Sequence, residues 1–299
     1  MDERIIDLSE EPAFLNVRYN QLIIKRDRRE DSLPLEDLAV LIVSHPAVSL
    51  THAVLSGLCA NAGAFIICDD RRLPTGMMLP LVGNSTLTER HHAQINASSP
   101  VNKRLWQQII MAKIRAQASV LNDVEGNDCG LSVLSTKVLS GDSSNIEARA
   151  SRHYWPILFG DSFRRTYDSN DGINVHLNYG YGVLRAIVGR AITASGLLPS
   201  VGIHHHNKYN PFCLADDLME PFRPLIDATV YEIIDIFGPD HPIDKDSKAV
   251  ILEKLLNQKW IYKKENRKLF DIVSKLTASL VQVYAGEKKK IIIPKIYDL

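Results

Sequence analysis

The sequence predicts an α+β protein, with a small β-rich domain at the N-terminus and a larger helical domain after it. Short apolar runs of strand length fill residues 1–83, whereas residues 84–100 are rich in Ser, Thr, Asn and His. From residue 101 to residue 299, apolar side chains recur at helical intervals instead. We therefore expect a β domain over 1–83 that forms a dimer surface, a linker over 84–100 and a helical catalytic domain over 101–299.

The N-terminal domain contains a predicted hairpin in "FLNVRYNQLIIKR", residues 14–26. Apolar and polar residues alternate from Leu15 to Tyr19, and the alternation resumes after the polar pair Asn20-Gln21. This pair is the expected turn between two strands.

Two further buried strands are predicted at 39–43 ("AVLIV") and 64–68 ("AFIIC"). The segment between them indicates one short helix, begun by Ser49 or Thr51 and ended near Gly63.

The helical domain opens with "NKRLWQQIIMAKIRAQASVL", residues 102–121, where Ile109 and Ala112 belong to an apolar face and Lys113 to a basic flank. The later helices are expected at 172–196, ended by Gly196; at 213–237, bent by Pro221 and Pro224; and at about 248–258 and 265–285.

The charges are balanced in total but not along the chain. Lys plus Arg and Asp plus Glu each number 35, yet residues 213–246 hold nine acids against two bases, and residues 254–295 hold eleven bases against three acids. The basic segment is a candidate contact for DNA or a protein partner, and its "IIIPKIY" end favours edge pairing as a strand. Two solvated helix faces and a packed C-terminal strand are the alternatives.

Several functional classes are excluded or disfavoured. No apolar run reaches the roughly 18 residues that a membrane span needs, and the N-terminus lacks a signal-peptide layout. The four cysteines show no CxxC spacing, which favours a reducing cytoplasm. There is no GxxxxGK[ST], GxGxxG, GxSxG or HExxH motif, which argues against a P-loop NTPase, a dinucleotide enzyme, a serine hydrolase and a zincin.

The stretch "VGIHHHNKYNPFCLADDLMEPF", residues 201–222, carries the first candidate site. Asp217 and Glu220 are three apart on a helix and share a face, and Arg223 continues that row. His205 lies twelve positions before Asp217, far enough for a loop to return it to the helix. One imidazole and two carboxylates suit Mn²⁺ or Mg²⁺, although a solvated loop over an acidic helix is the alternative.

Glu147 is a lone acid in a cationic helix with Arg149 and Arg152. It forms either an intrahelical ion pair or a metal ligand beside arginines that bind phosphate. Tyr154, seven positions on, is placed to present its hydroxyl to such a site.

Three motifs resemble a known family. "NIEARASRHYWPILFG", "LNYGYGVLRA" and "GIHHHNKYNPFCLADDLMEPFRP" are similar to the E-x-x-x-A-x-x-Y helix, the N-x-G-Y helix and the G-x-x-H loop of CRISPR-associated protein one, the spacer-acquisition integrase, in its type II-like form. The resemblance implies divalent-metal ligands at Glu147, His205 and Glu220, with Mg²⁺ or Mn²⁺ bound. Many relatives have aspartates at the last helix, so Asp217 is either a fourth ligand or a supporting acid.

The resemblance also implies a cytoplasmic enzyme that inserts short foreign DNA into a repeat array by transesterification. Its implied partners are double-stranded DNA, a dimer of CRISPR-associated protein two flanked by two homodimers of this chain, and other type II adaptation or effector proteins. A metal-dependent nuclease of branched or single-stranded DNA in repair, and a non-catalytic DNA-binding scaffold, are the rival interpretations.

Overall fold

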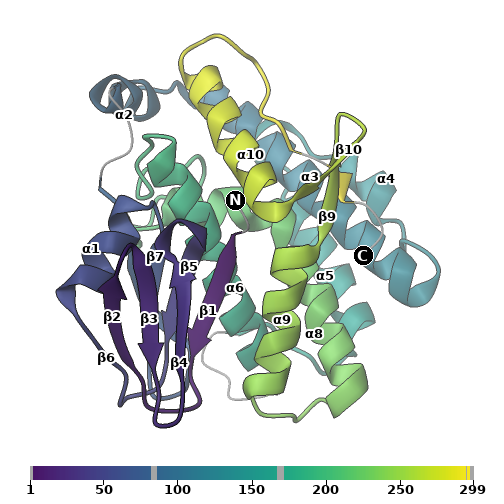
Figure 1. Cartoon of the computed structure of the whole chain (residues 1–299). Coiled ribbons are helices and arrows are strands. Elements are labelled where there is room, and N and C mark those ends of the chain that lie inside the picture. The colour runs from purple at the N-terminus through teal and green to yellow at the C-terminus, as the bar shows by residue number, and fades with distance from the viewer. Residues whose placement is uncertain (1–2, 82–85, 167–171, 294, 297–299) are drawn as a thin grey trace.

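The N-terminal part folds into two small sheets. The computed structural model describes residues 3–81, 86–166, 172–293 and 295–296. The first sheet has the order β1 (Arg4–Leu8), β5 (Leu38–Val43), β7 (Ala64–Cys68), β8 (Pro74–Met78), with β1, β5 and β7 parallel and β8 antiparallel to β7. The second has the order β4 (Glu30–Pro34), β3 (Gln21–Lys25), β2 (Phe14–Arg18), β6 (Ser49–Leu50) (Figure 1).

The predicted hairpin is confirmed, with its turn shifted by one residue. β2 and β3 pair antiparallel, and Arg18 faces Gln21 across the turn. Tyr19 and Asn20 both adopt left-handed backbone conformations, with φ of 52° and 58°. Two consecutive positive φ values match the twist of a two-residue hairpin, so Gln21 begins β3 instead of sitting in the turn.

The short helix between the predicted strands is also confirmed, as α1 (His52–Ala60), and Thr51 is its N-cap residue. It packs with the second sheet and one face of the first around Leu15, Leu41 and Leu58, which are fully buried.

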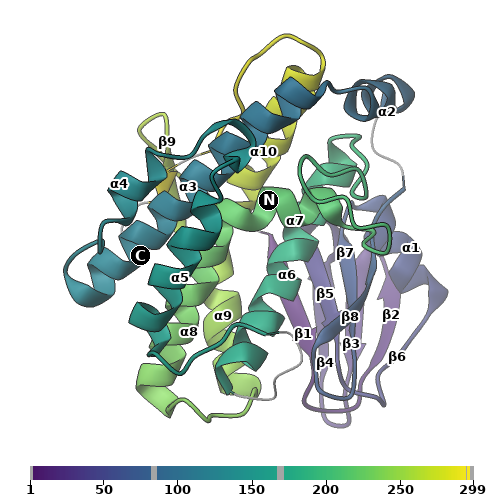
Figure 2. The same ribbon diagram turned by 180° about the vertical axis from the view of Figure 1, so that it is seen from behind.

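The C-terminal part is a cluster of helices that includes α6 (Gly172–Ala194), which lies between the first sheet and other helices in Figures 1 and 2. As predicted, the 213–237 segment bends at its prolines: α7 (Cys213–Met219) passes through the short helix η3 (Glu220–Phe222) into α8 (Arg223–Phe237). The remaining helices are α3 (Ser99–Glu125), α4 (Leu131–Ser135), η2 (Ser140–Asp142), α5 (Ile146–Phe159), α9 (Lys245–Asn257) and α10 (Leu269–Tyr284), and η1 (Leu35–Asp37) lies in the N-terminal part. Among the described residues, no helix has the length and apolarity to cross a membrane.

The local structure differs from the expectation in two places. The 84–100 segment, expected as a linker, contains α2 (Leu87–Ile95) and the start of α3, while residues 84 and 85 lie outside the described part of the chain. Tertiary hydrogen bonds stabilise α2, because the buried Gln94 amide donates to the carbonyl oxygens of Leu198 and Val201 at 3.0 and 2.8 Å. Hydropathy periodicity does not detect such polar anchoring.

The helical part is also not purely helical. Residues 265–268, expected as helix, form β10 (Glu265–Lys268), which pairs with β9 (Lys259–Tyr262), and β11 (Lys295–Ile296) pairs with the other edge of β9. The C-terminal segment therefore pairs within its own chain, as the packed-strand alternative expected. Left-handed Lys263 and Lys264 make the turn between β9 and β10.

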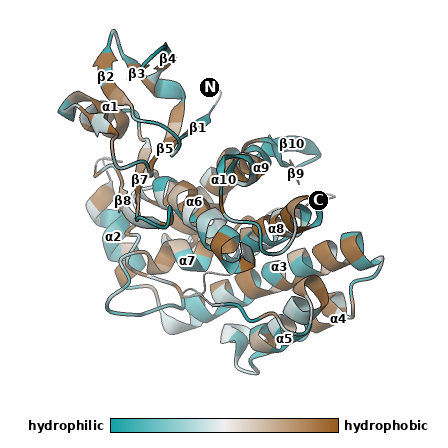
Figure 3. Ribbon diagram, turned by 90° about the horizontal axis from the view of Figure 1, so that it is seen from below, coloured by the Kyte–Doolittle hydropathy of each residue, from teal (hydrophilic) through white to brown (hydrophobic). Residues whose placement is uncertain are grey.

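One hydrophobic core joins the sheet to the helices. Val40, Ile42 and Ile66 of the first sheet belong to the same buried cluster as Leu184 and Ile187 of α6. In Figure 3 the apolar parts of α6 and α8 lie among the neighbouring helices. The hydrophobic packing is therefore continuous between the N-terminal sheet and the helices. The division of the chain into a β domain and a helical domain stays a prediction.

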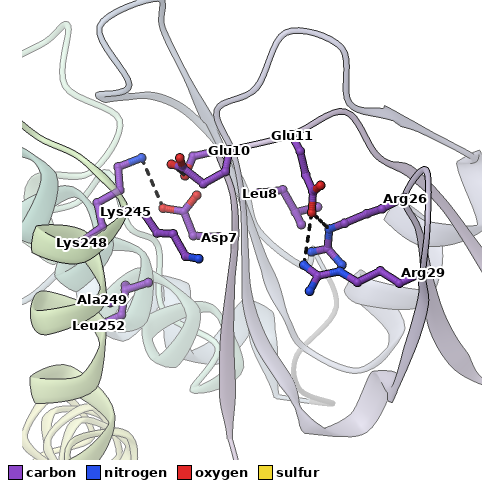
Figure 4. A pocket seen from close by; sticks show the side chains of 11 residues that line it. Asp7, Leu8, Glu10, Glu11, Arg26, Arg29, Lys245, Lys248, Ala249 and Leu252 are labelled. Carbon is purple, nitrogen blue, oxygen red and sulfur yellow. Dashed lines mark hydrogen bonds and ion pairs between the residues drawn. The ribbon is translucent and has the colours of Figure 1, made fainter.

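Polar contacts reinforce this junction beside a cavity of about 250 Å³ between β1 and α9 (Figure 4). The Tyr179 hydroxyl donates to Asp7 Oδ2 at 2.6 Å, and the buried Lys248 ammonium lies 3.5 Å from the same oxygen. An ion pair between β1 and α9 thus holds the sheet against the helices that carry the candidate site.

Candidate active site

Two of the sequence-predicted ligands, Glu147 and Glu220, meet around a lysine. The Lys113 ammonium of α3 lies 2.6 Å from Glu147 Oε1 and 2.6 Å from Glu220 Oε2. The side chains of Lys113 and Glu220 are 11% and 6% exposed, and that of Glu147 is 28% exposed. Carboxylates from α5 and η3, far apart in sequence, therefore face one shared and largely buried position.

Glu147 reaches this position because the start of α5 is capped by another acid. The carboxylate of Asp142 accepts hydrogen bonds from the backbone N–H groups of Ile146 and Glu147 at 2.8 and 2.9 Å. Glu147 is thus left free to pair with α3, so its partner is Lys113 and not an arginine of its own helix. Of the two alternatives for Glu147, the intrahelical ion pair is therefore not the one formed, and its role as a metal ligand stays a prediction.

Glu220 is held on its other side by Arg223, whose Nε lies 3.0 Å from Glu220 Oε1. Burial alone raises the pKa of the Glu220 carboxyl, but Arg223 and Lys113 outweigh it and hold that pKa below its ordinary value. Burial likewise tends to lower the pKa of Lys113, and the Glu220 and Glu147 carboxylates outweigh it, so the pKa is raised. Both groups are therefore ionised at neutral pH.

Asp217 organises the histidine loop. Its carboxylate accepts from the backbone N–H groups of Ile203 at 2.6 Å, His204 at 2.9 Å and His205 at 3.3 Å. It also lies 2.6 Å from Nδ1 of His205. Because these four contacts occupy a fully buried carboxylate, Asp217 acts as the anchor of the loop, and the prediction of a fourth ligand finds no support in its geometry.

The contact with Asp217 determines how His205 is presented. A proton on Nδ1 donated to Asp217 leaves Nε2 with the lone pair, which is the arrangement that carboxylate-bound histidine ligands use. Hydrogen bonding to Asp217 raises the pKa of His205, and the nearby Glu220 charge acts in the same direction.

Gly202 is required by the same loop. A Cβ atom at this position would lie 2.3 Å from the carbonyl oxygen of His205 and 2.9 Å from Asp217 Oδ2. Only glycine allows the backbone to close this tightly, which gives a physical reason for the glycine three positions before His205.

Trp106 of α3 packs against the histidine loop. Its ring stacks on His204 with centroids 4.2 Å apart and meets His205 edge-on at 5.6 Å. A cavity of about 420 Å³ adjoins this stack and is lined in part by Lys103 and His206. His204 thus packs against the tryptophan and His206 lines the cavity. Burial lowers the pKa of His204, and the nearby Glu147 charge opposes this shift.

The three predicted ligands are brought together only in part. Glu147 and Glu220 share the Lys113 ammonium, and His205 is close enough for Glu220 to affect its pKa. Within the part of the chain that the structure describes, no three His, Cys, Asp or Glu side chains converge as a formed metal-binding group. The acid pair is occupied by a cation of the protein itself.

The expectation that Tyr154 presents its hydroxyl to the site was wrong. Tyr154 is fully buried and donates to Asp227 Oδ2 at 3.1 Å, and the Tyr181 hydroxyl donates to the other oxygen of Asp227. Burial raises the pKa of Asp227 to about 7, although the two hydroxyl donors oppose this shift.

Lys113 is the site residue that the sequence interpretation missed. It was assigned to a basic flank, yet it lies four positions after the buried Ile109 and seven after Trp106, on the buried face of α3. A lysine in a buried stripe is rarely left without a carboxylate partner. The spacing of Lys113 from Ile109 and Trp106 was therefore the sequence signal that could have identified it as a buried, paired lysine.

Two solved structures share the overall fold of this chain. A casposase bound to integration product superimposes with a TM-score of 0.81 at 20% identity, covering 96% of this chain and 92% of that one. A Cas1 protein from Thermotoga maritima superimposes with a TM-score of 0.75 at 15% identity, covering 95% and 98%.

The sequence comparisons identify the family of this chain. Residues 7–266 match the family described as CRISPR associated protein Cas1. The CRISPR-associated endonuclease Cas1 of Neisseria meningitidis is 40% identical over 222 residues, which cover 73% of this chain and 72% of that protein. A Cas1 endonuclease of Francisella tularensis subsp. novicida is 24% identical over 308 residues, covering 94% and 95%. This chain belongs to the Cas1 family, as its motifs predicted.

Proposed function

We propose that this chain is a metal-dependent DNA integrase and endonuclease of CRISPR adaptation, which inserts short foreign DNA into a repeat array. The observation that carries the proposal is the convergence of Glu147 and Glu220 beside the Asp217-oriented His205. Family membership supports it, because the Neisseria relative is named an endonuclease and the casposase is bound to an integration product.

Glu147, Glu220 and His205 are the proposed ligands of Mg²⁺ or Mn²⁺. Their donor chemistry fits, since two carboxylates and a neutral imidazole suit these ions, and the 2.6 Å contacts of Lys113 show a position where both acids reach one cation. When bound, the cation polarises the phosphodiester and lowers the pKa of the attacking hydroxyl.

The other side chains prepare this chemistry. Asp217 orients His205 so that Nε2 carries the lone pair, and Arg223 keeps Glu220 ionised and positioned. The 3′-hydroxyl of the incoming DNA attacks a phosphodiester of the repeat strand; the new P–O bond forms as the bond to that strand's 3′-oxygen breaks. This exchange conserves the number of phosphodiester bonds, so it needs no nucleotide hydrolysis, in line with the missing P-loop.

Double-stranded DNA and Cas2 are the proposed partners in the cytoplasm. A chain of a Cas6-RT-Cas1–Cas2 complex superimposes with a TM-score of 0.75 at 16% identity, covering 99% of this chain and 36% of that one. The arrangement of two homodimers about a Cas2 dimer, dimer contacts through the β domain and further type II proteins belong to the same proposal.

A strand-transfer assay tests the proposed function. Purified protein, Cas2, Mn²⁺, a short duplex and a supercoiled repeat plasmid are combined, and joined product is scored against cleaved product. Joined product that disappears with Glu147→Gln and Glu220→Gln supports the integrase. Cleavage without joining favours the repair nuclease, and DNA binding without Mn²⁺-dependent chemistry favours the scaffold.

A further inference from the structure

Lys113 is part of a buried, balanced charge cluster. Glu147 and Glu220 supply two negative charges, and Lys113 and Arg223 supply two positive charges. The Lys113 ammonium contacts both acids, whereas Arg223 contacts Glu220. The protein thus neutralises its proposed ligand pair with a side chain from a third helix.

This arrangement opposes the binding of a second cation. A divalent ion held by Glu147 and Glu220 takes the carboxylate oxygens that Lys113 contacts. The ammonium is 11% exposed, so it would lose its partners in a place where water replaces them poorly. A buried charge without a partner is costly, so the lysine lowers the affinity of the free protein for the divalent ion.

A bound phosphate removes this cost. Glu147 is the most exposed member of the cluster, at 28%, so an anion approaching the acid pair reaches the ammonium from the Glu147 side. A phosphodiester at the site offers oxygens to the ammonium while it leaves the two carboxylates for the divalent ion. Lys113 then keeps a negatively charged partner in both states.

We propose that Lys113 couples the two binding events: its ammonium keeps the acid pair closed to divalent cations until a DNA phosphate takes the ammonium as its partner. This inference rests on the proposed function, because it takes Glu147 and Glu220 as the ligands. Linkage requires reciprocity, so Mn²⁺ must tighten DNA binding by the same factor by which DNA tightens Mn²⁺ binding.

Calorimetric titration of the full chain with Mn²⁺ tests the coupling. The titration is run alone and with a short duplex whose 3′ ends are dideoxy-terminated, so that no joining occurs. In the unsubstituted protein we expect DNA to tighten Mn²⁺ binding by about tenfold or more, the scale of removing one nearby charge. In Lys113→Met without DNA, we expect Mn²⁺ to bind about as tightly as it binds the unsubstituted protein with DNA. Adding DNA to this variant should then change its Mn²⁺ affinity by no more than about twofold.

Lys137→Met is the matched control, because Lys137 is an exposed lysine outside the cluster. It removes the same charge and should keep the full coupling. Lys113→Arg, which retains the charge, should also keep Mn²⁺ binding weak in the absence of DNA. Equal Mn²⁺ affinity of the unsubstituted protein with and without DNA overturns the inference and needs no variant.

The same titrations separate failure of the inference from failure of the proposed function. Binding of Mn²⁺ that Glu147→Gln abolishes, but that DNA and Lys113→Met leave unchanged, overturns the coupling and retains the metal site. Absence of Mn²⁺ binding under every condition overturns both.

Discussion

Nδ1 of His205 lies 2.6 Å from Oδ1 of Asp217, and the same carboxylate accepts the backbone N–H groups of residues 203–205. One buried acid therefore fixes both the path of the loop and the orientation of the imidazole. Hydrogen bonding to this acid raises the pKa of His205, so the histidine stays protonated to a higher pH than an isolated one.

The first prediction concerns the pH dependence of Asp217→Asn. The proposed ligand role of His205 needs neutral imidazole, so strand-transfer activity falls as pH drops through the His205 pKa. Asparagine keeps the shape but removes the charge, which lowers this pKa and moves the acid limb to lower pH. The pH–rate profile measures the shift, and an acid limb that stays in place or moves upward contradicts the assignment.

The second prediction concerns the acid pair. Glu147→Gln and Glu220→Gln should each reduce strand transfer by at least about a hundredfold, because a lost ligand removes several kcal/mol of transition-state stabilisation. DNA affinity measured without divalent cations should change by less than threefold, roughly, since the phosphate backbone and not the acids supplies it. Gel-shift assays in a chelator and strand-transfer assays with Mn²⁺ check the two values, and Glu232→Gln on the exposed side of α8 is the control.

The third prediction concerns Gly202→Ala. The added Cβ would overlap the His205 carbonyl oxygen at 2.3 Å, so the loop must shift and His205 with it. A displacement of about 1 Å at a reacting group typically costs on the order of a hundredfold in rate. Gly76→Ala on β8 is the control, because its Cβ would find Ile67 at an ordinary 3.8 Å. Full activity in Gly202→Ala would show that the tight loop is dispensable.

The fourth prediction concerns stability and Asp227. Burial raises the pKa of Asp227 from 3.8 to about 7, so between these values the folded protein binds a proton that the unfolded chain releases. The contribution of Asp227 to stability is thus fully present below about pH 4, declines as pH rises to about 7 and is level above it. Asp227→Asn should flatten this decline in urea unfolding between pH 5 and pH 8, whereas Asp235→Asn, an exposed change on the same helix, should not.

The fifth prediction concerns the C-terminal segment. Ile291 is 7% exposed, and its N–H donates to Gln108 Oε1 of α3 at 3.1 Å, while the N–H of Ile292 donates to Ser279 Oγ of α10 at 2.8 Å. Ile291→Ala should therefore lower the free energy of unfolding by about 2 kcal/mol or more.

Lys289→Ala in the exposed run 288–290 provides the contrast. It should leave stability within about 0.5 kcal/mol. If the basic run contacts DNA or Cas2, this variant weakens that binding alone. A loss of stability on Lys289→Ala, or none on Ile291→Ala, would contradict the view that Ile291 packs in the fold while the basic run 288–290 serves only to contact a partner. Deleting residues 286–299 should accordingly impair both folding and assembly.

The elements most easily predicted were those whose burial follows a simple period. Alternation marked β2 and β3, and the long apolar face marked α6 up to Gly196. The segments that were missed owe their structure to distant partners. α2 depends on Gln94 reaching the loop near Val201, and β9 with β11 depends on the end of the chain returning to residue 260.

The sequence by itself determined the strand-rich start and the helical remainder, because local period records them directly. Its motifs also identified the family, and that resemblance implied the candidates Glu147, His205 and Glu220. Only the tertiary structure decided that Lys113 stands between the two glutamates and that Asp217 belongs to the loop backbone. The physical reason is that an ion pair depends on distance in space: α3, α5 and η3 are separated along the chain, and packing alone determines which charges meet.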